Sequence, residues 1–202
     1  MPVVSLILAS SSPFRKTLLA KLGVAFEVVS PDIDESRKNG ETPEQLVFRL
    51  AQEKAWEVAK TQSGLIIASD QISTLEEGLG ANDVVLGKPH THKNAVKQLQ
   101  GSSANTVTFK TSLALLNTNT GNMQTIVHTT KVFFKALSAE KIESYLQEDQ
   151  PYKCAGSFKS ETPAGGSLFE RVEGDDPDAL VGLPLIQLAE MLKNEGVETL
   201  KY

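Results

Sequence analysis

The first twenty residues constrain the fold most, because they join an apolar run to a helical pattern through a turn of serines. Leu6 to Ala9 form the apolar run, and three serines, residues 10–12, follow it. Ser12 suits a helix N-cap and Pro13 suits the first helical position, after which leucines recur at helical spacing. The segment therefore predicts a buried strand, a turn and a helix that begins at Pro13.

The start of this predicted helix has the local chemistry of a phosphate site. A helix N-terminus carries unpaired N–H donors and a partial positive charge. Here the hydroxyls of Ser10 and Ser12 and the guanidinium of Arg15 surround it. A serine before a proline is also an ordinary helix cap. These residues alone leave both interpretations open, an anion site and a structural cap.

Composition excludes several classes of protein. With 202 residues, 40% of them hydrophobic, the chain can bury a full core. Its net charge of −5 argues against a general nucleic-acid binder and against binding to an anionic membrane surface. The single cysteine, Cys154, excludes an intrachain disulfide and fits a reducing compartment, and no apolar run approaches the roughly 20 residues of a membrane span. We expect a cytoplasmic protein that binds neither nucleic acid nor membrane.

Residues 30–54 contain an acidic turn and a lysine within an apolar helix stripe. Residues 30–37 form an acidic turn that includes Glu35, which is either a site for a divalent cation or a solvated loop. Residues 42–45, Thr-Pro-Glu-Gln, then form a capping box that opens a helix. Lys54 falls inside the apolar stripe of this helix, so its ammonium either snorkels to the surface or reaches an internal polar site.

An uninterrupted apolar run, Leu65 to Ala68, predicts a central strand that ends at Ser69, Asp70 and Gln71. In open α/β sheets the carboxyl ends of strands face the ligand crevice, and a partly desolvated carboxylate there is a natural base or metal ligand. An aspartate that caps the next turn is the alternative.

The remaining pattern mixes strands and helices. Residues 74–85 predict an excursion before a stiff turn at Lys88, and residues 106–135 predict a long antiparallel hairpin. Helices are expected from Thr91 to a stop at Gly101, from Ser138 to a stop before Pro151, and over residues 184–194. Glu161, in a segment of small residues, is either a reader of a nucleobase or a surface acid. The mixture indicates an α/β fold with a partly antiparallel sheet.

Six motifs occur in an order that resembles the Maf-like nucleotide pyrophosphatase family. They are residues 8–15, 34–35, 52–55, 69–71, 87–89 and 154–161. The resemblance implies a two-lobed α/β protein, a single domain over residues 1–202, with a nucleotide cleft across an elongated mixed sheet flanked by helices. It also implies a homodimer and metal-dependent hydrolysis of a nucleoside triphosphate to a monophosphate and diphosphate.

The resemblance also implies roles for individual residues. Asp70 becomes the proton acceptor that activates water, and it shares a divalent cation, Mg²⁺ or Mn²⁺, with Glu35. Cations and hydroxyls would hold the phosphates, which suits a reaction that needs mainly positioning and charge neutralisation. The expected phosphate-binding residues are Ser10, Ser12, Arg15, Lys54 and Lys88.

Substrate choice in this family depends on three positions, here Phe14, Gln71 and Glu161. They resemble the subgroup that cleaves 7-methyl-GTP, a modified purine nucleoside triphosphate. An aromatic face attracts the positive charge of a methylated guanine, and a carboxylate can accept the hydrogens of its Watson–Crick edge. Phe14 could equally pack its helix against the core.

Two other functions stay open: a pyrophosphatase for dTTP and UTP, and a non-catalytic nucleotide-binding regulator of cell division. The chain also departs from the family pattern in two segments. The segment at residues 76–83 is longer than usual in the family, and residues 162–167 differ in sequence from the family pattern. The second departure could loosen the loop that carries Glu161.

Overall fold

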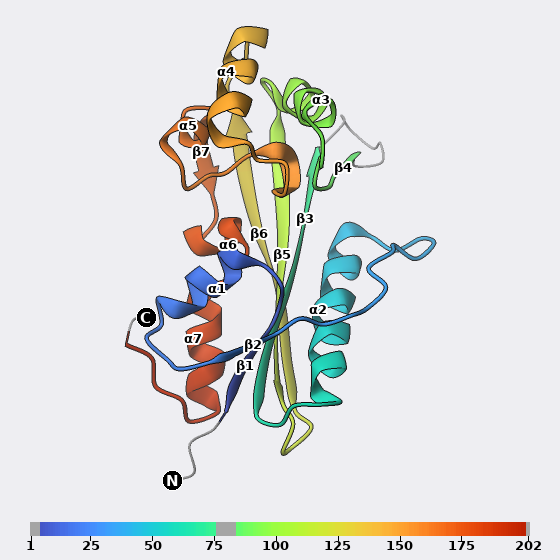
Figure 1. The fold of residues 1–202 in the computed structure, drawn as a ribbon, viewed down its shortest axis with the longest axis vertical. Helices are drawn as coiled ribbons and strands as arrows, with labels where there is room; N and C mark the ends of the chain where they lie inside the picture. The colour runs from blue at the N-terminus through green and yellow to red at the C-terminus, as the bar shows by residue number, and fades with distance from the viewer. Residues whose placement is uncertain (1–4, 76–83, 201–202) are drawn as a thin grey trace. The chain divides into compact units, whose positions relative to one another are not determined.

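The computed structural model describes residues 5–75 and 84–200. Within them, seven strands form one mixed sheet in the order β2-β1-β3-β5-β6-β7, and β4 pairs with β3 (Figure 1). The strands are β1 (Leu6–Ala9), β2 (Glu27–Val29), β3 (Leu65–Leu75), β4 (Val84–Leu86), β5 (Thr106–Asn117), β6 (Met123–Phe134) and β7 (Phe169–Glu173). The helices are α1 (Pro13–Ala20), α2 (Pro43–Ala59), α3 (His92–Ser102), α4 (Ala139–Asp149), the 3₁₀ helix η1 (Ala155–Ser157), α5 (Pro163–Gly166), α6 (Pro177–Val181) and α7 (Leu185–Asn194).

The chain divides into two compact units. The first comprises residues 1–70, 111–128 and 176–202, and the second comprises residues 71–110 and 129–175. The mixed sheet flanked by helices confirms the predicted α/β class. The single-domain assignment stays a prediction.

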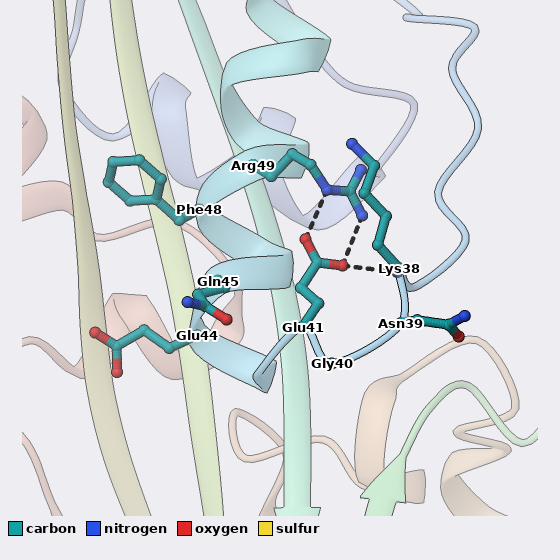
Figure 2. A pocket seen from close by; sticks show the side chains of 8 residues that line it. All are labelled: Lys38, Asn39, Gly40, Glu41, Glu44, Gln45, Phe48 and Arg49. Atoms are coloured by element: carbon teal, nitrogen blue, oxygen red, sulfur yellow. Dashed lines mark hydrogen bonds and ion pairs between the residues drawn. The ribbon is translucent and has the colours of Figure 1, made fainter.

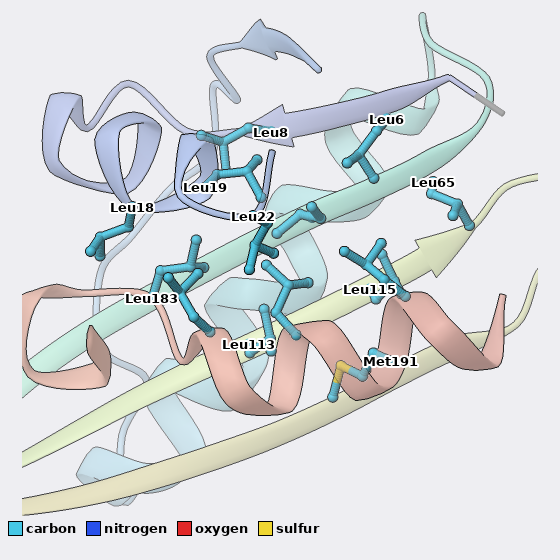
Figure 3. Packing of buried hydrophobic residues seen from close by; sticks show 14 residues of the cluster. Leu6, Leu8, Leu18, Leu19, Leu22, Leu65, Leu113, Leu115, Leu183 and Met191 are labelled. Carbon is cyan, nitrogen blue, oxygen red and sulfur yellow. The ribbon is translucent and has the colours of Figure 1, made fainter. Parts of the chain in front are cut away.

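The core of the first unit follows from the alternation of side chains along parallel strands. β1 pairs in parallel with both β2 and β3, and successive residues of a strand point to opposite faces of a sheet. Leu6 and Leu8 therefore join one cluster, with leucines of α1 and α7 (Figure 3), whereas Ile7 and Ala9 join a second cluster with residues of α2. The helices cover both faces, which is why β1 and residues 65–68 of β3 are continuous apolar runs.

The second unit is built on antiparallel pairs. β4 returns along β3, with Ser73 opposite Leu86, and β7 pairs antiparallel with β6. Phe158 packs edge-on against three other rings at centroid distances of 5.2–6.1 Å. These partners are Phe109, Phe134 and Phe169. Residues 76–83, where the sequence predicts an excursion, lie outside the described residues.

Several predicted boundaries are wrong. β3 does not end at Ser69 to Gln71, as predicted, but continues to Leu75, so Asp70 and Gln71 lie within the strand. The parallel ladder with β1 ends just before the predicted end, at the pair Ala9–Ala68. β3 extends further because it continues beside β5 and then β4. Gly101 lies inside α3 rather than closing it. The structure also contains four short elements that the sequence pattern did not predict: η1, α5, β7 and α6. None of the described helices is long and apolar enough to cross a membrane.

Candidate active site

The serine turn before α1 acts as a helix cap. Ser12 Oγ accepts a hydrogen bond from the Arg15 N–H at 3.4 Å, and the buried Ser10 Oγ accepts from the Ser12 N–H at 3.1 Å. The structural interpretation is therefore confirmed. A hydroxyl that accepts a hydrogen bond still has its own hydrogen to donate. Capping thus leaves both serines able to donate to an anion.

Arg15 is held by a residue far along the chain. Its Nε donates to the Gly182 carbonyl at 2.9 Å, and Ser69 Oγ donates to the same oxygen at 2.9 Å. This bond uses one of the five N–H donors of the guanidinium. Burial lowers the pKa of Arg15, and the negative charges of Asp70 and Glu35 oppose that shift. Arg15 therefore lies within electrostatic reach of both carboxylates.

Lys54 joins the two carboxylates directly. Its Nζ lies 2.5 Å from Asp70 Oδ1 and 2.7 Å from Glu35 Oε1. The lysine is buried, with 5% of its surface exposed, so its ammonium reaches an internal polar site and does not snorkel. The Glu35 side chain is 58% exposed and the Asp70 side chain 14%. Two cations and two carboxylates thus balance one another around Asp70.

The backbone of Asp70 is also fixed. Ser112 Oγ, on the neighbouring strand β5, accepts from the Asp70 N–H at 3.0 Å and donates to the Asp70 carbonyl at 3.2 Å. A carboxylate on a rigid, central strand keeps its position when a ligand binds.

In the second unit, Lys88 is exposed on a turn that α3 holds from both sides. Gln98 Nε2 donates to the Gly87 carbonyl at 3.0 Å, and Asn94 Nδ2 donates to the Pro89 carbonyl at 3.0 Å. Gln98 also accepts a hydrogen bond from Ser157 Oγ, in η1. Two amide side chains therefore set the direction of the Lys88 turn.

Glu161 lies in a loop that its neighbours anchor. The Lys159 N–H donates to the Tyr145 hydroxyl at 2.9 Å, and Lys159 Nζ donates to the Asp149 carbonyl at 2.6 Å. Thr162 Oγ1 caps α5 by accepting from the Gly165 N–H at 3.0 Å. Glu161 itself is exposed, and Gln71 is half-buried on β3.

Lys88 and Glu161 both lie close enough to Cys154 for their charges to affect its thiol. The pKa of its thiol is raised to about 11, mainly by burial and then by the negative charge of Glu161, while the positive charges of Lys159 and Lys88 oppose the rise. The thiol is therefore protonated at neutral pH, which does not suit a catalytic nucleophile.

A model of the family described as Maf-like protein matches residues 5–195. The chain belongs to the Maf-like family. Among curated Maf-like relatives, proteins named 7-methyl-GTP pyrophosphatase are 49% identical in Nitrosococcus oceani and 50% identical in Methylobacillus flagellatus. The first match covers 97% of this chain and 96% of the relative, and the second covers 96% and 98%.

Solved structures at low identity have a similar fold. A HAM1 protein from Coxiella burnetii superposes with a TM-score of 0.52 at 15% identity, over 95% of this chain and 100% of that one. This likeness supports the fold alone.

The structure brings four predicted site residues of the Maf-like chain together in the first unit: Arg15, Glu35, Lys54 and Asp70. It also places Lys88 and Glu161 in one neighbourhood of the second unit. Sequence reasoning missed Gly182 and Ser112, which hold Arg15 and Asp70. The Asp-Pro pair at residues 176–177, a cap followed by a first-turn proline, was a signal for the segment that leads to Gly182.

The Glu35 and Asp70 carboxylates fit a divalent cation that takes its other ligands from the substrate and water. Among the described residues no group of three or more His, Cys, Asp or Glu side chains could enclose a metal ion. Mg²⁺ is usually bound by one or two carboxylates together with substrate phosphates and water. Glu35 and Asp70 match that donor set, in which Lys54 would compete with the ion for the carboxylate oxygens.

Two glycine substitutions test whether residues 162–167 loosen the loop that carries Glu161. A Cβ on Gly165 would lie 1.7 Å from the Lys159 carbonyl oxygen, whereas one on Gly166 would meet nothing within 4 Å. We expect Gly165→Ala to lower the free energy of unfolding by about 1–3 kcal/mol, because backbone must shift. Gly166→Ala, in the same short helix, is the matched control. Equal melting temperatures for the two variants would show that the loop yields without cost.

Proposed function

We propose that this chain hydrolyses 7-methyl-GTP to 7-methyl-GMP and diphosphate. The observation that carries the proposal is the Lys54 ammonium between Asp70 and Glu35, with Arg15 in electrostatic reach of both. Such a cluster combines a base with cations for phosphate oxygens. The names of the relatives favour 7-methyl-GTP over dTTP and UTP as substrate.

In this proposal Asp70 accepts a proton from the water that attacks the α-phosphorus. Its carboxylate then carries the proton while the bond between the α-phosphorus and its bridging oxygen breaks and diphosphate leaves. Arg15, Lys54 and Lys88 bind phosphate oxygens, and Ser10 and Ser12 donate hydrogen bonds to them. A divalent cation held by Glu35 and Asp70 would supply further charge neutralisation.

Base recognition is assigned to Phe14, Gln71 and Glu161. The charge of the methylated guanine favours an aromatic face, and Glu161 can accept two hydrogens from its edge. Phe14 is half-buried on α1 and Glu161 is exposed, so neither side chain is committed entirely to the core.

We further propose that the enzyme works in the cytoplasm as a homodimer and does not bind nucleic acid. Its net charge of −5 supports the last point, because a nucleic-acid binder needs a basic surface. The lone cysteine fits a reducing compartment.

Product analysis on a panel of nucleotides tests the proposed function. We expect 7-methyl-GTP to be cleaved faster than dTTP and UTP, with monophosphate and diphosphate as products, dependence on Mg²⁺ or Mn²⁺ and no activity on monophosphates. Binding of 7-methyl-GTP without turnover would instead support the regulator, and release of single phosphates would exclude the proposed reaction.

A further inference from the structure

Arg49 lies outside the proposed site, and its guanidinium makes polar contacts with three residues: Ser36, Glu41 and Glu53. Its Nε and Nη2 bind the two Glu41 carboxylate oxygens at 2.6 and 2.8 Å, and Nη2 also donates to the Ser36 carbonyl at 3.0 Å. Its Nη1 binds Glu53 Oε2 at 2.8 Å. Figure 2 shows Arg49 and Glu41 facing each other at the start of α2. Both residues line an open pocket of about 540 Å³.

These contacts connect α2 to the loop that carries Glu35. Residues 30–42, between β2 and α2, form no helix or strand, and most of them are exposed. Glu41 is the centre of the loop's hydrogen bonds: its carboxylate accepts from the Lys38 N–H at 3.0 Å, and its carbonyl accepts from Arg37 Nε at 2.7 Å. Arg49 therefore binds Glu41, which accepts hydrogen bonds from two other residues of the loop. It also binds the carbonyl of Ser36, the residue that follows Glu35.

The Arg49–Glu41 pair is suited to act as an anchor. The two side chains are only 16% and 9% exposed, and a two-pronged arginine–carboxylate pair has a defined geometry that lysine cannot reproduce. The hydrogen bonds from Arg49 lower the pKa of Glu41 to about 2. The carboxylate is therefore ionised, and the pair intact, at neutral pH.

We propose that Arg49 is a positioning residue that holds Glu35 in place beside Lys54 and Asp70. Arg49 and Lys54 lie on the same helix, so the anchor fixes the Glu35 loop to the element that presents the lysine. The Glu35 side chain is more than half exposed and lies on a loop without helix or strand. This inference rests on the proposed function, in which Glu35 helps to bind the divalent cation.

The test combines hydrogen exchange with a Mg²⁺ titration, in Arg49→Gln, Arg49→Lys and Glu41→Gln. We expect amide exchange in residues 34–41 of the nucleotide-free protein to become at least about tenfold faster, as expected of a loop that opens locally. The Mg²⁺ concentration for half-maximal activity should rise about tenfold to a hundredfold, the scale for losing a residue that orients a metal ligand. Turnover at saturating Mg²⁺ should stay within about threefold of the parent enzyme, because the other groups are intact.

Lys60→Gln is the matched control, since it removes one positive charge from the other end of α2, where Lys60 pairs with Glu57. It should change neither the exchange nor the Mg²⁺ requirement. Unchanged exchange and unchanged Mg²⁺ requirement in all three test variants would overturn the proposal. So would an equal loss of turnover at every Mg²⁺ concentration together with a lower melting temperature, which indicates a purely structural role.

The same experiment separates this proposal from the proposed function. Hydrogen exchange needs no substrate, so it reports on the Arg49 anchor even if the parent enzyme fails to cleave 7-methyl-GTP. A parent enzyme without hydrolytic activity would overturn the proposed function, whereas an active parent with unaffected variants would overturn only the role of Arg49.

Discussion

Asp70→Asn is expected to lower the turnover of 7-methyl-GTP by at least about a hundredfold, the usual scale for losing a general base. Asparagine keeps the shape of the side chain and removes its charge. The proposed base is lost, and the buried Lys54, whose Nζ lies 2.5 Å from Asp70 Oδ1 in the parent protein, retains its ion pair with Glu35. The measurement is turnover at saturating nucleotide over a range of Mg²⁺ concentrations.

The Mg²⁺ range distinguishes two roles of Asp70. A loss that persists at high Mg²⁺ identifies the proton acceptor, whereas recovery at high Mg²⁺ identifies a metal ligand that is not the base. Asp32→Asn removes an exposed carboxylate from the acidic turn and should retain normal turnover. Near-normal turnover of Asp70→Asn with saturating metal would show that another group activates the water. Melting temperatures establish that each variant is folded.

The second large effect concerns substrate choice. The double change Phe14→Arg with Glu161→Gln should lower the preference for 7-methyl-GTP by on the order of 2–4 kcal/mol, because the base loses an aromatic face and a charge-assisted pair of hydrogen bonds. UTP needs neither contact, so its cleavage should fall far less. The quantity to measure is the ratio of kcat/KM for 7-methyl-GTP to kcat/KM for UTP in both proteins.

A matched control for this double change lies on α2. Phe48 is 39% exposed, and Phe48→Arg with Glu44→Gln makes the same chemical changes at the open pocket. It should leave the ratio unaltered. If both substrates decline in parallel in the double change at Phe14 and Glu161, these residues are structural or generally catalytic, and the assigned specificity loses its physical basis.

Local sequence signals were sufficient for much of the first unit. The cap at Ser12, the capping box at Thr42 and the strand at Leu65 all depend on residues within a few positions of one another, and the structure confirms each. Lys54 was a candidate because a lysine in an apolar stripe either snorkels to the surface or reaches an internal polar site. Which partners it has, Asp70 and Glu35, could not be predicted from the pattern of the helix itself.

The missed features depend on contacts between distant parts of the chain. The Gly182 carbonyl that holds Arg15 is 167 residues away, and no local pattern predicts such a bond. The predicted strand ended at Ser69 to Gln71 because the apolar run stops at Ala68. The polar residues nevertheless continue β3, where Ser112 of the next strand hydrogen-bonds the Asp70 backbone. The short elements α5 and α6 have too few residues to show a helical period.

Hydrolysis of 7-methyl-GTP in ¹⁸O-labelled water identifies the site of attack, because the label marks the phosphorus that water attacks. The proposed role of Asp70 places the attack on the α-phosphorus. Mass spectrometry of the products should therefore find one ¹⁸O atom in 7-methyl-GMP and none in diphosphate. Label in diphosphate, or in released single phosphate, would contradict this account of the reaction.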